Sequence, residues 1–112
     1  MLLSCAHSKT MVSMGLPAFE GKYQPPPVIP FEYFKRLEAE VAAQRRDAFM
    51  DASIEYIDYS RDARDLIELA RLARRPGGAG LAAARDYVER AVPELEGCQK
   101  ALNVMVPLLP AF

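Results

Sequence analysis

Between Phe31 and Arg75 the chain contains neither proline nor glycine, so a long helix is the expected structure there. These 45 residues are rich in Ala, Leu, Glu and Arg, which have high helix propensity. Pro30 suits the first turn of a helix, and Pro76-Gly77-Gly78 would stop it. An unbroken helix of this length would extend about 67 Å, which is longer than a compact domain of this size is wide. We therefore expect either a break, near Ala52-Ser53 or Tyr59-Ser60, or a helix that projects onto another protein.

A second helical pattern runs from Gly80 to about Val106. Pro93 lies inside this pattern and predicts either a kink or the start of a new helix. Because the connection between the two patterns is short, we expect the helices to pack as antiparallel neighbours. One face carries the apolar residues of the second pattern, namely Leu81, Ala84, Val88, Ala91, Leu95, Cys98, Leu102 and Met105.

The sequence thus predicts an all-α fold with three parts. Residues 31–106 form a helical hairpin, consisting of a long helix and an antiparallel return helix. Residues 1–30 form an extended, proline-rich docking segment, because proline and the residue before it are excluded from helices. Residues 107–112 form an apolar tail that is not expected to be helical, since it contains Pro107 and Pro110.

The apolar residues of the first helix lie on more than one face. One stripe consists of Phe34, Leu37, Val41 and Ala48, and a cleaner one of Ala52, Tyr56, Tyr59, Ala63, Leu66, Ala70 and Ala73. The second stripe has the spacing of a seam that faces one partner helix. Met50, Ile54 and Ile57 occupy another face. Because two helices cannot enclose such faces, we expect other protein chains to cover them.

Composition and charge exclude several classes of protein. The net charge is −1, so bulk charge does not favour nucleic acid as a partner. The 51% of hydrophobic and 26% of charged residues are typical of a globular protein. No apolar stretch is long enough to span a membrane, and the N-terminus lacks the apolar core of a secretory signal. The first 19 residues contain no acid, which favours a mitochondrial setting; the alternative is an intracellular soluble protein.

Residues that could support catalysis are scarce. His7 is the single histidine, and no Glu-x-x-His metal motif or glycine-rich phosphate loop after a strand is present. We therefore predict no enzyme activity, no cofactor and no metal site. The two cysteines, Cys5 and Cys98, are interpreted either as reduced thiols or as a single bridge between the N-terminal segment and the last helix.

Two charged surfaces are candidates for binding. Acidic residues line one face of the first helix, at Asp51, Glu55, Asp58, Asp62 and Asp65. They form either a solvated face or a docking strip for a basic partner. Arg71, Arg74, Arg75 and Arg85 bracket the turn, and no acid lies between Glu68 and Asp86. These arginines either serve helix-end electrostatics and solubility, or bind an anion, which would be a lipid headgroup, an RNA phosphate or an acidic partner.

The remaining candidate contacts with a protein partner are apolar. We expect the proline-rich segment to lie as a strap along a neighbour, and the tail to fold back on the hairpin or dock in another subunit. The predicted partner-binding residues are Tyr23, Pro25, Pro26, Pro27, Val28, Ile29, Phe31, Tyr56, Tyr59, Leu66, Leu108, Leu109 and Phe112.

These features predict a non-catalytic structural or accessory subunit of a larger multiprotein assembly, such as a mitochondrial respiratory or ATP synthase complex. The alternative is a self-contained adaptor or chaperone-like module that homodimerises into a four-helix bundle through the Ala52–Ala73 seam.

Overall fold

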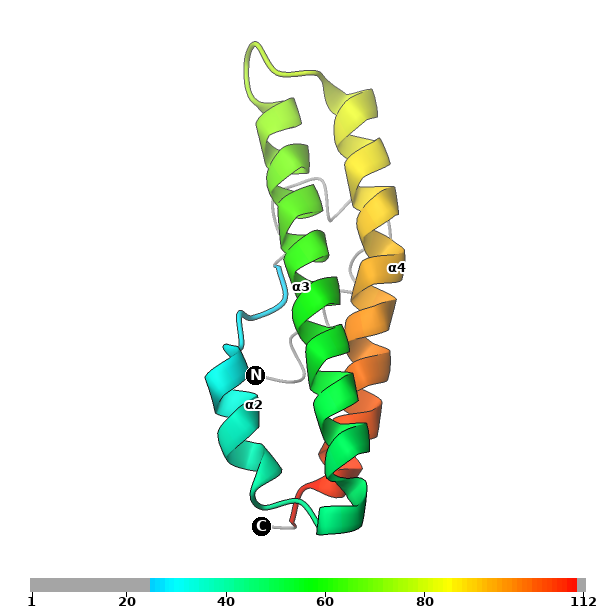
Figure 1. Cartoon of the computed structure of the whole chain (residues 1–112). Helices are drawn as coiled ribbons and strands as arrows, with labels where there is room; N and C mark the ends of the chain where they lie inside the picture. The colour runs from blue at the N-terminus through cyan, green and yellow to red at the C-terminus, as the bar shows by residue number, and fades with distance from the viewer. Residues whose placement is uncertain (1–24, 111–112) are drawn as a thin grey trace.

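A computed structural model describes residues 25–110 of the chain, and in this range it contains helices and no strand. The two long helices are α3 (Arg46–Arg74) and α4 (Leu81–Met105), which run antiparallel and are joined by a short turn (Figure 1). The shorter elements are α2 (Phe31–Glu38) and the 3₁₀ turns η2 (Ala43–Arg45) and η3 (Val106–Leu108). The predicted all-α helical hairpin is confirmed.

The hairpin is an elongated rod with principal-axis extents of 52 × 22 × 18 Å. α2 lies beside the lower half of α3, while the turn between α3 and α4 stands at the opposite end (Figure 1). We call these two ends the base and the tip. Within the described part of the chain, no helix combines the length and the apolar character that a bilayer crossing requires.

The long first helix breaks at a different place from the predicted one. The interruption lies between α2 and α3, at Ala39–Arg45, and α3 continues without a break through Ala52-Ser53 and Tyr59-Ser60. Ser53 and Ser60 are buried, but their hydroxyl groups donate hydrogen bonds to backbone carbonyls one turn earlier in the same helix. Because the buried hydroxyls are satisfied inside α3, they impose no break.

The actual interruption depends on tertiary contacts, because its residues are good helix formers. The side chain of Val41 is only 2% exposed. The Arg46 guanidinium donates from Nε to the Val41 carbonyl at 3.0 Å and from Nη2 to the Ala39 carbonyl at 3.4 Å. These bonds supply partners for carbonyls that a continuous helix would have satisfied itself. The chain therefore folds back, and α2 packs against α3.

The core between α3 and α4 is built largely from small side chains. The predicted seam is buried inside the single chain at Ala52, Tyr56, Ala63, Ala70 and Ala73, and the α4 stripe is buried from Ala84 to Met105. The first member of the α4 stripe, Leu81, is 65% exposed. Most of the seam therefore packs within the chain, while two of its members, Tyr59 and Leu66, are half-buried, and the predicted four-helix homodimer stays a prediction.

Gly97 marks a close approach of the two long helices. A Cβ atom added to Gly97 would lie 2.6 Å from the ring of Tyr59, closer than side chains pack. The aromatic ring therefore occupies the space that a side chain on α4 would need. This contact explains a glycine in the middle of a helix, where alanine would otherwise be preferred.

Two predictions about α4 and the tail require correction. Of the two alternatives for Pro93, the start of a new helix is wrong, because α4 runs as one helix through this exposed residue, whereas the kink stays a prediction. The tail was expected to be non-helical, but Pro107 and Leu108 belong to the 3₁₀ turn η3. Proline fits such a turn because its first residues need no backbone donor. Leu108 and Leu109 are half-buried against the core of the same chain.

Candidate functional site

The strap, residues 25–30, lies along this chain's own α3 (Figure 1). Pro30 has polyproline-II dihedral angles, with φ −69° and ψ 149°. Ile29 and Pro26 are buried, and the Tyr56 hydroxyl donates a hydrogen bond to the Pro27 carbonyl at 2.9 Å. Val28 is 67% exposed. The strap thus turns Val28 and Pro30 outward and buries Pro26 and Ile29 within the chain.

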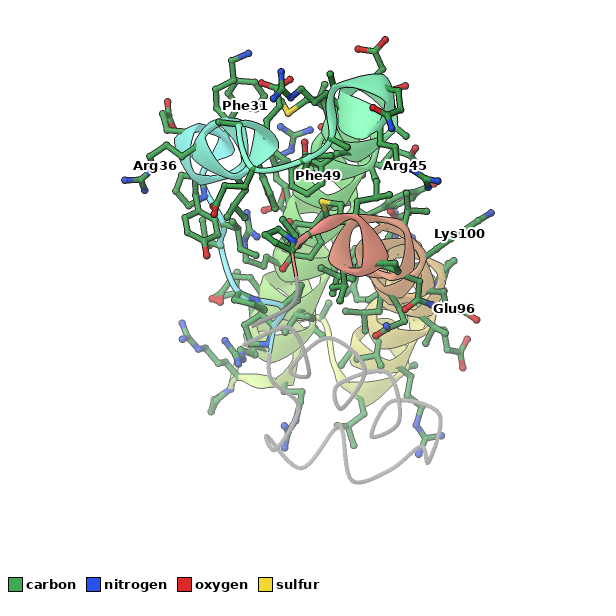
Figure 2. All side chains as sticks on the ribbon, turned by 90° about the horizontal axis from the view of Figure 1, so that it is seen from below. Phe31, Arg36, Arg45, Phe49, Glu96 and Lys100 are labelled. Carbon is green, nitrogen blue, oxygen red and sulfur yellow. The ribbon has the colours of Figure 1, made fainter. Side chains whose placement is uncertain are left out.

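An aromatic cluster joins α2 to the hairpin. The ring of Phe34 meets Phe49 and Tyr56 edge to face, with centroid distances of 6.5 and 5.9 Å. Viewed along the rod from its base, Phe49 points into the space between α2, α3 and α4, whereas Arg36 and Glu96 point outward (Figure 2). The favourable geometry of these pairs adds to the burial of the rings. Through this cluster, α2 forms a third wall at the base of the rod.

A cavity of about 100 Å³ opens at this base, which we call the base pocket. All three helices contribute to it. Its lining is apolar except for the hydroxyl group of Tyr33, and consists of Ile29, Tyr33, Phe34, Leu37, Phe49, Leu102, Met105, Val106 and Leu109. Two lining residues remain exposed, Tyr33 at 39% and Val106 at 45%. The cavity has the size of a single ring or branched aliphatic side chain.

The four predicted arginines lie at the tip and are all exposed. Arg71 and Arg74 end α3, Arg75 follows it, and Arg85 lies in the first turns of α4. Leu69, Leu72 and Leu81 are also exposed at this end, at 41%, 42% and 65%. The tip therefore combines positive charge with apolar surface.

The tip turn depends on glycine. Gly77 and Gly80 have φ values of +82° and +100°, a region that other residues avoid. At Gly78 an added Cβ would approach the Ala73 carbonyl oxygen to 2.7 Å. The backbone amides of Gly78 and Gly80 donate to the carbonyls of Arg75 and Ala73, both at 2.8 Å. The turn is thus closed by its own hydrogen bonds.

The predicted acidic face is exposed along α3, at Asp51, Glu55, Asp58, Asp62 and Asp65. Arg61 forms an ion pair with Asp58 at 3.1 Å. Glu94 of α4 faces this strip beside Asp62, Asp65 and Arg90. Partial burial and, second, the negative charge of Asp62 raise the pKa of Glu94 above its ordinary value. The two helices therefore hold like charges close together across one edge of the hairpin.

Comparison with known proteins finds no match for this chain among family models, curated proteins or solved structures. Its function must therefore be argued from its own residues. In residues 25–110, no three His, Cys, Asp or Glu side chains are grouped so as to hold a metal ion.

The structure distributes the predicted partner-binding residues over different environments. Phe31 and Val28 are exposed, whereas Tyr56 is completely buried and has no surface to offer a partner. Tyr59, Leu66, Pro25 and Pro27 are half-buried. The remaining positions of interest lie outside the described residues, namely Tyr23 and Phe112, together with Cys5 and His7. Cys98 is buried on α4, and the predicted bridge to Cys5 stays a prediction.

Sequence reasoning missed Tyr33 and Val106, which form the exposed part of the base pocket. Tyr33 lies one position before the apolar stripe that begins at Phe34, and Val106 follows the last member of the α4 stripe. Large apolar residues next to a stripe are a signal for a widened apolar face. The pocket itself was not predictable, because it requires the reversal of the chain between α2 and α3.

Proposed function

We propose that this protein is a non-catalytic subunit of a larger protein assembly, and that a partner protein docks at the base of its hairpin. The observation that carries this proposal is the base pocket, with Tyr33 and Val106 exposed at its opening. Val28 and Phe31 add exposed apolar surface on the strap and at the start of α2. Aromatic and aliphatic anchors buried in such pockets commonly dominate protein interfaces.

The chemistry of the pocket favours a protein side chain over a small-molecule ligand. Sites for small molecules usually combine an apolar lining with several polar groups that fix the orientation of the ligand. Here the Tyr33 hydroxyl is the single polar side-chain group of the lining. A volume of about 100 Å³ suits one phenylalanine or leucine side chain of the partner. The backbone of the partner protein, rather than polar groups of the pocket, would then fix the orientation of this side chain.

Five of the seven seam residues are buried within the chain, which supports an assembly of different chains rather than the homodimeric adaptor. The acid-poor first 19 residues lead us to propose a mitochondrial complex, respiratory or ATP synthase, as the setting. Fluorescence microscopy of the tagged full-length chain tests the setting separately from the docking site.

Native electrophoresis of the tagged chain from its own cells tests the docking site. Val106→Glu places a charge at the pocket opening, and Val104→Glu is a matched control, because Val104 is equally exposed at 44% but does not line the pocket. We expect the unmodified chain and Val104→Glu to migrate in one high-mass band, and Val106→Glu to leave it while circular dichroism shows an unchanged helix content. Migration of the unmodified chain at the mass of a dimer, or equal behaviour of both variants, would refute the proposal.

A further inference from the structure

We propose that the tip of the hairpin binds the surface of a membrane that contains anionic phospholipid. The observation behind this proposal is that four exposed arginines and three exposed leucines lie together at the end of the rod opposite the base pocket. The inference concerns a second site and a second kind of partner, so it does not depend on the proposed docking of a protein at the base.

The sequence segment that forms the tip carries positive charge only. Residues 69–85 contain Arg71, Arg74, Arg75 and Arg85 and no acidic residue, although the whole chain has a net charge of −1. The nearest acids in sequence are Glu68 and Asp86. Asp86 and Glu89 line the same surface hollow as Arg85 and Leu81, and Asp86 also lies 3.8 Å from Arg90, so the excess positive charge is carried by Arg71, Arg74 and Arg75 on the α3 side of the tip. A localised charge of this kind attracts anionic headgroups within about one Debye length of the surface.

The apex between the arginines is apolar. Residues 76–84 carry no polar or charged side chain, and Leu81, the largest of them, is 65% exposed. The amides of Gly78 and Gly80 are already hydrogen-bonded inside the turn. The apex can therefore enter the headgroup region without leaving these donors unsatisfied. In a lipid surface the arginines would lie at the level of the phosphates, and the apolar apex between them would reach the acyl chains.

The same residues fit nucleic acid less well. Residues 69–85 contain no aromatic side chain that could stack on a base. They also contain no Ser, Thr, Asn or Gln to read base edges. Exposed leucines would gain nothing from a phosphate backbone, whereas an interfacial lipid layer would bury them. The observations therefore favour lipid over RNA.

Flotation of the full-length chain with vesicles tests the role of charge. The vesicles contain phosphatidylcholine alone or phosphatidylcholine with phosphatidylglycerol. We expect binding to the anionic vesicles only, weakened about 25-fold by the double substitution Arg74→Gln/Arg75→Gln, at about fivefold for each arginine. The control Arg45→Gln/Lys100→Gln removes the same charge at the base, where both side chains point outward (Figure 2), and should bind almost normally.

Fluorescence tests insertion of the apex, because the chain has no tryptophan of its own. Leu81→Trp should shift its emission to the blue when anionic vesicles are added, and Val104→Trp at the opposite end should not. Three results would overturn the proposal: no binding to the anionic vesicles, equal loss in the two double variants, or an unchanged emission of Leu81→Trp. Tighter binding of single-stranded or duplex RNA than of the vesicles would replace lipid by RNA as the partner.

The docking proposal and the membrane proposal can be refuted independently of each other. Val106→Glu should leave vesicle binding unchanged, because Val106 lies at the base. Arg74→Gln/Arg75→Gln should leave the high-mass band of native electrophoresis intact when membranes are dissolved by a mild detergent.

Discussion

The Tyr56 hydroxyl donates a hydrogen bond of 2.9 Å to the Pro27 carbonyl, across 29 positions of sequence. This bond fastens the strap to the middle of α3, and the Tyr56 ring also meets Phe34 of α2 edge to face. One fully buried side chain thus holds both the strap and α2 against the hairpin. The base pocket lies directly below this junction, since Ile29 of the strap and Phe34 are part of its lining.

Tyr56→Phe keeps the ring and removes this hydrogen bond. We expect a loss of about 1 kcal/mol in the free energy of unfolding, because the Pro27 carbonyl loses its partner in a half-buried position. In a domain of this size the melting temperature should fall by about 4 to 8 °C. Thermal denaturation followed by circular dichroism measures the change. Tyr87→Phe is the control, because Tyr87 contacts Arg90 through its ring, which phenylalanine retains. An equal loss in both variants would argue against a special role for the Tyr56 bond.

The Arg46 side chain should stabilise the reversal between α2 and α3. Arg46→Ala removes the bonds to the carbonyls of Val41 and Ala39, and we expect it to cost about 1 kcal/mol. Arg45→Ala is a matched control, because its side chain is exposed and points away from the pocket (Figure 2). It should change the stability by less than about 0.5 kcal/mol. Chemical denaturation compares the two variants, and a larger effect of Arg45→Ala would contradict this explanation of the break.

The hairpin itself was predictable because local signals agree with one another. Helix formers continue to Arg75, Pro76 and the glycines end the helix, and the apolar stripe of α4 repeats with helical spacing. The break at Ala39–Arg45 was not predictable, because Ala, Glu and Val there do not interrupt a helix. It depends on the burial of Val41 and on the reach of Arg46. The helix propensity of these residues is therefore outweighed by the contacts of Val41 and Arg46, which form only when the helix is broken.

The candidate sites also differ in whether local sequence or contacts formed on folding determine them. The arginine tip was visible in the sequence, since it depends on a run of residues around one turn. The base pocket combines α2, α3 and the end of α4, so it appears only after the chain has reversed. The strap was predicted to lie on a neighbouring protein, but its described part packs on α3 of the same chain. Apolar pattern alone does not distinguish burial within a chain from burial between chains.

Gly97→Ala should destabilise the protein although alanine is the better helix former. The added methyl group would overlap the Tyr59 ring, at 2.6 Å from its atoms. We expect a net loss of about 1 to 3 kcal/mol from overpacking. The same substitution in a Tyr59→Ala background should be neutral or stabilising by up to about 1 kcal/mol, because only helix propensity then remains. Chemical denaturation of the four proteins gives the coupling energy, and additive effects would show that the contact is unimportant.

Glu94 should make the stability depend on pH in a definite direction. Its pKa in the folded state is raised above the ordinary value of 4.5 by burial and by Asp62, so the folded chain binds this proton more tightly than the unfolded chain. The resulting stabilisation is fully present below the unfolded pKa and is lost as the pH rises through the folded pKa. Glu94 is therefore least favourable at neutral pH, where it and Asp62 are both charged.

Glu94→Gln should then raise the melting temperature at pH 7, and this advantage should shrink as the pH falls and Glu94 itself becomes protonated. Glu89→Gln on the exposed face of α4 is the control for the loss of one negative charge from this helix. Asp62→Asn should reduce the benefit of Glu94→Gln, because it removes the repelling charge but not the burial of Glu94. If the benefit of Glu94→Gln grows as the pH falls, the sign of the coupling is wrong. The two carboxylates would then be stabilised by Arg90 and by solvent more strongly than they repel each other.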